Sequence, residues 1–115
     1  MLVPGEARKV TVYLNEDTSS KRNFLYGEIL AFLLENGVAG ATMFRPDAGF
    51  GSHHRLHTAG AGSIEGEHLP VRIEFLERAE VVDRLLPGLC EMVTDGLVEM
   101  HATTIVKYAT QVQQV

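Results

Sequence analysis

Apolar residues alternate at a period of two and then recur at a helical period, and this order occurs twice along the chain, which limits its fold more than any other feature. Residues 9–14 alternate apolar and polar side chains, as a sheet strand does. Residues 21–36 carry apolar side chains at helical spacing, and Gly37 follows where a helix commonly ends. Residues 40–45 predict a second, short strand.

The second half of the chain repeats this plan. Residues 71–76 alternate as a strand, and residues 78–95 have the apolar spacing of a helix that Gly96 closes. Pro87 lies inside that helix and removes one backbone donor, so we expect a kink or a break there. Residues 97–107 predict a long final strand with apolar side chains on both of its sides.

The order strand, helix, strand, strand, helix, strand predicts an α+β chain of the ferredoxin-like (βαββαβ) kind. Two βαβ units in succession form a four-stranded antiparallel sheet with both helices on one face. The 115 residues make a single domain, and the second face of the sheet has no layer to cover it. Apolar residues occur on both strand phases, for example Tyr13 beside Val12, whereas a solvated face would carry more charge. We therefore expect the chain to self-associate.

Composition places the chain among globular proteins and excludes several classes of function. Its net charge of −5 disfavours general attraction to nucleic acid or to anionic membranes. A single cysteine, Cys90, excludes an intramolecular disulfide and a multi-cysteine zinc site, and its apolar neighbours predict a core position. No apolar run approaches the ~20 residues of a membrane span, and the first residues lack the pattern of a secretory signal. We expect a cytoplasmic protein.

The segment between the second and third predicted strands, residues 46–69, is long for a connection in so small a domain, and such loops are commonly functional. It is rich in glycine and histidine. Because imidazole is a common metal ligand, His53, His54 and His57 are candidate metal ligands; exposed, neutral loop residues are the other interpretation. Protonation of these histidines at about pH 6 also predicts a pH-sensitive loop.

Four short motifs carry a resemblance to a known family: Gly40-Ala41-Thr42, Gly49-Phe50-Gly51, Leu69-Pro70-Val71 and Gly96-Leu97-Val98. In this order and spacing, over about residues 8–107, the chain resembles the family numbered 190 among domains of unknown function, which belongs to the PII-like signalling proteins. The resemblance implies a ferredoxin-like protomer, a homotrimer, and a ligand site in the cleft between neighbouring subunits. It also implies that residues 46–69 are the T-loop, which reports ligand binding to a partner. We expect no tightly bound cofactor.

The resemblance further implies which residues meet the ligand. Thr42 falls on a threonine that lies near adenine in PII proteins, and Glu74 falls on a glutamate beside the adenine edge. The Gly49-Phe50-Gly51 turn falls where the backbone approaches nucleotide phosphates. His53 falls on a glutamine that helps to hold phosphate and metal.

Departures from PII proteins limit the expected effector. Their phosphate loop is rich in glycine and ends in lysine, whereas this chain has Asp95 there, which repels phosphate. Their paired C-terminal arginines are missing, and Lys107 is the nearby cation. Arg45 and Arg55 flank the glycine turn and are further candidates to hold an anion. We therefore expect a nucleotide with few phosphates, or a small anion. The candidate ligand-binding residues are Thr42, Arg45, Gly49, Phe50, Gly51, His53, Arg55, Glu74 and Lys107.

Three functions agree with these residues. The first is a trimeric regulator that binds a small effector and signals through residues 46–69 to a partner, which the resemblance implies to be a membrane transporter or channel. The alternative is a divalent-metal-binding trimer related to cation tolerance, based on His53, His54 and His57. The third is a nucleotide hydrolase with His53 or Glu74 as base. The chain has no catalytic triad, paired catalytic carboxylates or Walker loop, so we expect no enzyme activity.

Overall fold

A computed structural model describes residues 2–15, 24–50, 57–58 and 70–111 of the chain. Each strand and helix that the periodicity predicts is present there, with bounds that differ by a few residues. In chain order the elements are β1 (Gly5–Asn15), α1 (Leu25–Glu35), β2 (Ala41–Phe44), β3 (Ala48–Gly49), β4 (His57–Thr58), β5 (Pro70–Glu77), α2 (Ala79–Met92) and β6 (Gly96–Ile105).

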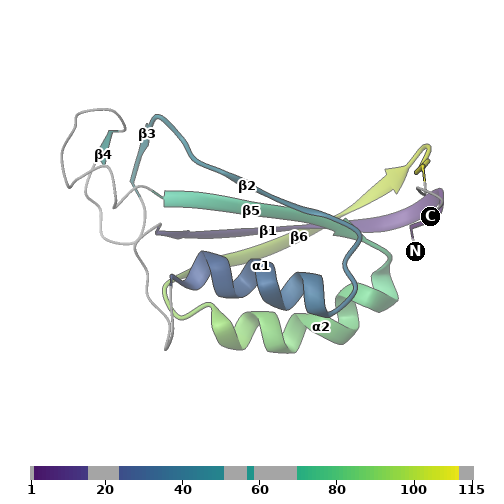
Figure 1. Ribbon diagram of the computed structural model, residues 1–115, viewed down its shortest axis with the longest axis horizontal. Coiled ribbons are helices and arrows are strands. Elements are labelled where there is room, and N and C mark those ends of the chain that lie inside the picture. The colour runs from purple at the N-terminus through teal and green to yellow at the C-terminus, as the bar shows by residue number, and fades with distance from the viewer. Residues whose placement is uncertain (1, 16–23, 51–56, 59–69, 112–115) are drawn as a thin grey trace.

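Four of the strands form one antiparallel sheet in the order β2-β5-β1-β6. Both helices lie along one face of this sheet (Figure 1), and the described residues leave the other face, here named the open face, uncovered. This strand order with antiparallel pairing is the ferredoxin-like plan, so the predicted fold is confirmed. Neither of the described helices is long and apolar enough to cross a membrane.

The core lies between the sheet and the two helices. β1 and β5 are the central strands, and alternate residues on each point toward the helices and are buried, as a period of two predicts. The helices contribute the buried side chains of Ile29 and Leu33 from α1, and of Val82, Leu85 and Leu89 from α2. The strand residues of the core are Val10, Val12, Leu14, Val71, Ile73 and Phe75.

The buried face of β5 ends in a glutamate, Glu77, which is 1% exposed. Its carboxylate oxygens accept hydrogen bonds from the Ala39 N–H at 3.1 Å and from the Arg78 N–H at 3.2 Å. A carboxylate is costly to bury unless such donors replace the lost water. Glu77 thereby links the end of β5 to the connection between α1 and β2, a link that apolar alternation alone does not predict.

α1 ends at Glu35, and Gly37, which was predicted to close it, follows two residues later with a φ of +78°. The Gly37 N–H donates to the Leu34 carbonyl at 3.2 Å, and the Val38 N–H donates to the Leu33 carbonyl at 3.1 Å. This pair of bonds is the Schellman motif, in which a left-handed residue lets the chain leave the helix. Val38 and Leu33 are both buried in the core, so the turn directs the chain back toward the sheet edge where β2 lies.

α2 is continuous over Ala79–Met92, so the break expected at Pro87 does not occur. Leu85 and Leu89 lie on either side of Pro87 and are both buried. Because the turns before and after the proline are each anchored in the core, the loss of one backbone donor does not interrupt the helix.

The predicted role of Gly96 is also wrong, because α2 already ends at Met92 and Gly96 is the first residue of β6. A Cβ atom at Gly96 would collide with the backbone carbonyl oxygen of Tyr13 on β1. Glycine is required there by the close approach of two strands, not by the end of a helix.

Cys90 is exposed, so its predicted core position is wrong. The buried side of α2 is defined by Val82, Leu85 and Leu89. Cys90 follows Leu89 by one residue and is therefore turned by about 100° around the helix axis, away from the sheet.

β3 and β4 pair as a short antiparallel ribbon, with Ala48 opposite Thr58 and Gly49 opposite His57. Residues 46–69 therefore contain regular structure that the periodicity did not predict. Figure 1 shows this ribbon beyond the start of β5, at the opposite end of the sheet from the start of β1.

Candidate functional site

The register of the sheet places one largely apolar row across the open face, near the end that adjoins β3. Tyr13 lies opposite Leu97 on one side and Arg72 on the other, and Phe44 lies opposite Arg72. We name these four residues the aromatic row. The Arg72 guanidinium lies over the Phe44 ring, 4.4 Å from its centroid. Leu97, Tyr13 and Phe44 are 51%, 36% and 42% exposed, so the described residues leave this row uncovered.

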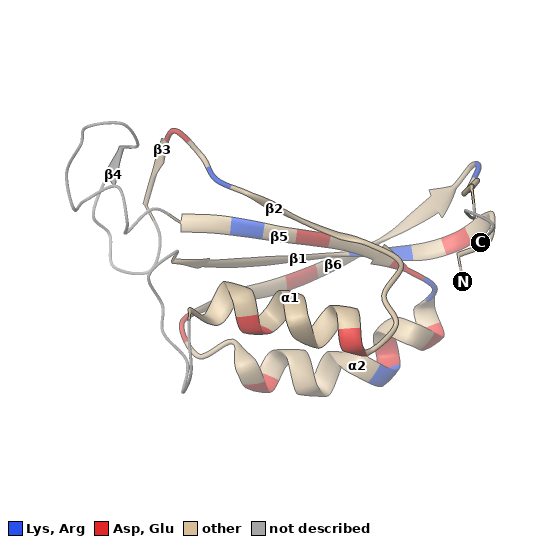
Figure 2. Ribbon diagram, in the orientation of Figure 1, with Lys and Arg blue, Asp and Glu red and all other residues tan. Residues whose placement is uncertain are grey.

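Glu74 occupies the next row of the open face and forms two ion pairs. Its carboxylate lies 2.9 Å from Lys9 Nζ and 2.8 Å from Arg72 Nε. The hydrogen bond from Lys9 lowers the pKa of Glu74 below its usual value. Burial opposes this change, and the charges of Lys9, Arg72 and His101 add to it. Charges of both signs also lie along β5 in Figure 2, so the open face carries more charge than the sequence indicated.

A cavity of about 450 Å³ opens between the aromatic row and β3. We name it the arginine cavity, because Arg45 and Arg72 both line it. Arg45 also lies 5.6 Å from the centroid of the Tyr26 ring of α1. Two guanidinium groups beside aromatic rings suit a planar, anionic ligand. The other lining residues are Tyr13, Phe44, Pro46, Ala48, Phe50, Pro70 and Val71.

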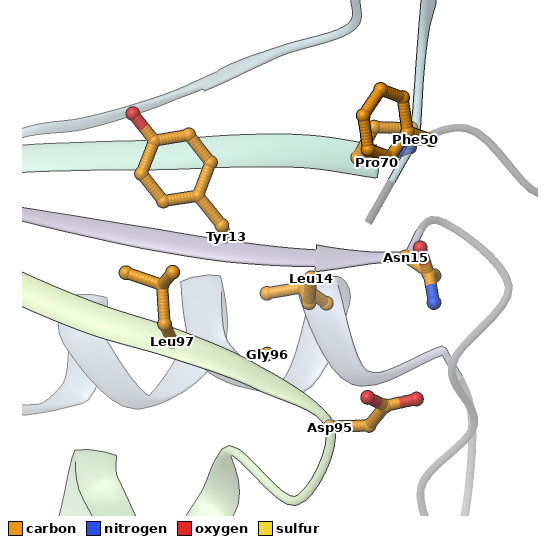
Figure 3. Close-up of a pocket in the computed structure, with 8 residues that line it drawn as sticks. All are labelled: Tyr13, Leu14, Asn15, Phe50, Pro70, Asp95, Gly96 and Leu97. Carbon is orange, nitrogen blue, oxygen red and sulfur yellow. The ribbon is translucent and has the colours of Figure 1, made fainter. Parts of the chain in front are cut away.

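A second cavity, of about 420 Å³, lies at the adjoining ends of β1, β5 and β6 (Figure 3). We name it the end hollow. It shares Tyr13, Phe50 and Pro70 with the arginine cavity, so the two cavities lie side by side. Its polar side chains are those of Asn15, the last residue of β1, and Asp95, which precedes β6. The rest of its lining is formed by Leu14, Gly96 and Leu97.

The structure brings together part of the predicted ligand set at the arginine cavity. Arg45 and Phe50 line it, and Phe50 is 63% exposed. Gly49 precedes Phe50 in β3, and a Cβ atom there would lie 3.0 Å from Pro70 Cγ. Glycine at this position therefore allows β3 to approach the start of β5.

The remaining described members of the set lie elsewhere. Thr42 and Glu74 are opposite each other in the register and line a smaller cavity of about 240 Å³ on the open face. Lys107 follows the far end of β6, whose ten residues rise by about 33 Å from Gly96. Within one chain, Lys107 does not reach the arginine cavity.

Several predicted residues cannot be placed. Gly51, His53, His54 and Arg55 lie outside the described residues, and of His57 only the backbone, in β4, is described. Their roles stay predictions from the sequence. In the described part of the chain, no group of three His, Cys, Asp or Glu side chains could hold a metal ion.

Tyr13, Asn15, Pro70 and Arg72 were not predicted from the sequence as site residues. Strand alternation put Tyr13 on the open face, but a single sequence does not report that this face adjoins a cavity. Asn15 pairs with Pro70 at the very end of β1. A polar residue that directly ends an apolar strand was the available signal, because strand ends in small domains often meet loops that carry sites.

Solved structures define the class of this fold as PII-like. The chain is similar to CPII from Thiomonas intermedia K12, a nitrogen regulatory PII-like protein solved bound to ADP, AMP and bicarbonate. The TM-score is 0.67, with 19% identity over 93% of this chain and 94% of CPII. It is also similar to a protein of Thermus thermophilus described as a PII-like signaling protein. That TM-score is 0.65, with 18% identity over 91% of this chain and 94% of the other.

The family follows from sequence comparison. Residues 7–105 match the model of the family DUF190, described as Uncharacterized ACR, so this chain belongs to that family, as its four motifs predicted. Among curated proteins, the chain is similar to the UPF0166 protein MJ1524 of Methanocaldococcus jannaschii. The two are 28% identical over 98 residues, which cover 81% of this chain and 85% of that protein.

Proposed function

We propose that this chain is a PII-like regulator that binds a small effector, either an adenine nucleotide or a small anion, at the arginine cavity. The observation that carries the proposal is the presence of Arg45 and Arg72 beside aromatic rings in one cavity at the base of residues 46–69. CPII has the same fold and was solved bound to ADP, AMP and bicarbonate, which supports the proposal.

Arg72 is held in an orientation that suits an anion. Its ion pair with Glu74 runs through Nε, and the Phe44 ring supports the plane of the guanidinium. A guanidinium has five N–H donors, so its terminal nitrogens can still donate to oxygens of a phosphate or bicarbonate. Its planar, forked geometry gives such a contact direction as well as charge.

Arg45 offers a route from ligand binding to a signal. It lies in the connection between β2 and β3, whereas Arg72 lies on the central strand β5. An anion held by both would fix this connection against the sheet. Because residues 46–69 begin at that connection, the bound and free states would present different surfaces to a partner. The partner that the family resemblance implies is a membrane transporter or channel, met from the cytoplasm.

We further propose a homotrimer with the cavity at the cleft between subunits. The exposed aromatic row supports this assembly, because contiguous exposed apolar surface commonly marks an interaction site. Lys107 would join the ligand set from a neighbouring subunit, since it lies far from its own cavity. The other predicted contacts remain part of the proposal: Thr42, Gly49, Phe50, Gly51, His53, Arg55 and Glu74.

Titration calorimetry of the full chain with AMP, ADP, ATP, cyclic AMP and bicarbonate tests the proposal. We expect micromolar binding of at least one of them, and Arg45→Gln to weaken it about tenfold, the effect of one charged hydrogen bond. Arg84→Gln is the matched control, because Arg84 lies on α2 and donates to the Asn36 carbonyl. The proposal fails if no effector binds, or if both substitutions weaken binding equally.

A further inference from the structure

The end hollow contains two polar side chains that the proposed anion site does not use. β1 and β6 pair with Leu14 opposite Gly96, so the next step of the register brings Asn15 level with Asp95. Figure 3 shows both side chains at this end of the sheet, and the amide nitrogen of Asn15 points to the side on which Asp95 lies. The hollow thus combines an amide and a carboxylate with walls that are otherwise apolar, aromatic or backbone.

Asn15 is only 7% exposed, yet the described residues give its side-chain amide no hydrogen-bond partner. An amide side chain offers two donors and an acceptor oxygen. These groups are therefore available to a ligand that enters the hollow. The Tyr13 and Phe50 rings in its wall suit a flat heterocycle, since aromatic rings and bases stack.

We propose that the end hollow holds the base of the effector and selects adenine, an inference that rests on the proposed function. A carboxamide pairs with adenine through two bonds, in which it donates to N7 and accepts from the N6 amine. The Asp95 carboxylate supplies a further acceptor for the N6 amine. A carboxylate has about four acceptor positions, so a bond that Asp95 already makes does not prevent this contact.

The two cavities are near enough for one nucleotide to occupy both. They share part of their lining, and β6 and β5 are two strand spacings, about 10 Å, apart. With its base at Asn15 and Asp95, a nucleoside monophosphate directs its phosphate toward Arg45 and Arg72. The hollow offers no cation to a longer phosphate chain in its described lining.

This placement differs from the one that the family resemblance implies. Thr42 and Glu74 lie two rows along the sheet from the row of Asn15, which is about 13 Å. A single base cannot contact both sets of residues. The charged environment of Glu74, between Lys9 and Arg72, also leaves its carboxylate already engaged by two cations.

Calorimetric titration of the full chain with AMP and IMP tests the inference, because IMP carries a carbonyl oxygen in place of the N6 amine. We expect AMP to bind at least about tenfold more tightly than IMP. Asp95→Asn should remove most of this preference and improve IMP binding, since an amide can donate to the IMP oxygen. Asn15→Ala should weaken AMP binding, so that the affinity for AMP approaches the affinity for IMP. Thr42→Val tests the other candidate position for the base. Asp83→Asn, on α2 and outside the described lining of both cavities, is the matched control for Asp95→Asn and should leave the preference unchanged.

Equal affinity of the unaltered chain for AMP and IMP would overturn the inference and leave the proposed function standing. If Thr42→Val lost the preference for AMP over IMP while Asp95→Asn kept it, the inference would also be overturned and the proposed function would still stand. Failure of every nucleotide and of bicarbonate to bind would instead remove the proposed function, and this inference with it. Asn15 is buried, so circular dichroism must show that Asn15→Ala is folded; if it is not, Asp95→Asn decides, because Asp95 is only partly buried.

Discussion

Glu74 carries a negative charge between Lys9 and Arg72, and this environment makes the stability of the open face depend on pH. Its pKa is lowered, chiefly by the hydrogen bond from Lys9. A lowered pKa means that the ionised carboxylate is more favourable in the folded chain than in the unfolded one. The stability it contributes is therefore complete above the usual pKa of 4.5 and is lost as the pH falls through the lowered value.

Glu74→Gln should accordingly lower the free energy of unfolding at neutral pH by about 0.5–1 kcal/mol, because the Lys9 and Arg72 side chains are each 40% exposed and solvent screens their attraction to the carboxylate. The difference from the unaltered chain should shrink as the pH falls through the lowered pKa of Glu74, because protonation removes the charge that Lys9 and Arg72 attract. Urea denaturation without ligand, at about pH 7 and about pH 3, measures both values.

Glu99→Gln is the matched control for Glu74→Gln, because Glu99 lies in the same row of the open face, on β6, and is exposed. An exposed substitution of this kind should change the free energy of unfolding by less than about 0.5 kcal/mol. If Glu74→Gln destabilised the chain by the same amount at both pH values, the charge of Glu74 would not be the cause.

Strand phase was the residue property that the sequence predicted best. Strand alternation alone puts Glu74 and His101 on the side away from the helices, and the register places both there. The exposure of Cys90 and the place of Asn15 in a cavity were not predicted, and both misses have the same physical reason. One helical step separates a buried from an exposed position, and one strand step separates a core strand from its end, so small errors in placing an element reverse the environment of such residues.

α1 contains one glycine in its first turn and is closed by another, and the two have opposite requirements. Gly37 has a φ of +78°, which side chains with a Cβ atom adopt at a cost. Gly27 has no positive φ, and a Cβ atom there would meet nothing within 4 Å. Gly37→Ala should therefore lower the free energy of unfolding by about 1 kcal/mol, whereas Gly27→Ala should raise it by about 0.5–1 kcal/mol.

Urea denaturation of both variants beside the unaltered chain measures this contrast. The same substitution is compared within α1 and just after its end, so general effects of an added methyl group cancel. A stabilising effect of Gly37→Ala would show that the left-handed turn does not end α1.

Long elements were predicted because their periods repeat over many residues, and short or contact-dependent features were not. The ribbon of β3 and β4 has two residues in each strand, too few for any period to show. Pro87 suggested a break, but packing of Leu85 and Leu89 overrides the local preference. Gly96 resembled a helix stop, although the requirement for it comes from the carbonyl of Tyr13 on another strand.

The site depends on the whole molecule, which is why the sequence predicted only part of it. Arg45 was found because it flanks the glycine turn, and Phe50 because it lies within that turn. Tyr13 and Arg72 reach the same cavity only through the pairing of distant strands. The open face then combines exposed aromatic and aliphatic side chains with the paired charges around Glu74. Apolar surface with matched charges beside it suits contact with another copy of the chain better than contact with water.

Leu97→Glu tests this assembly, with Leu34→Glu as its control. Leu97 is 51% exposed on the open face, and Leu34 is 77% exposed on α1, in the layer behind the other face of the sheet. Native mass spectrometry of the unaltered chain should give the mass of three subunits, and Leu97→Glu should give that of one, because a buried carboxylate without a partner is costly. Leu34→Glu should remain trimeric, since the proposed interface does not include the helices. A single-subunit mass for the unaltered chain at micromolar concentration would contradict the trimer. Dissociation by Leu34→Glu alone would instead place the contact on the helices, and the cleft at the arginine cavity would then have no second wall.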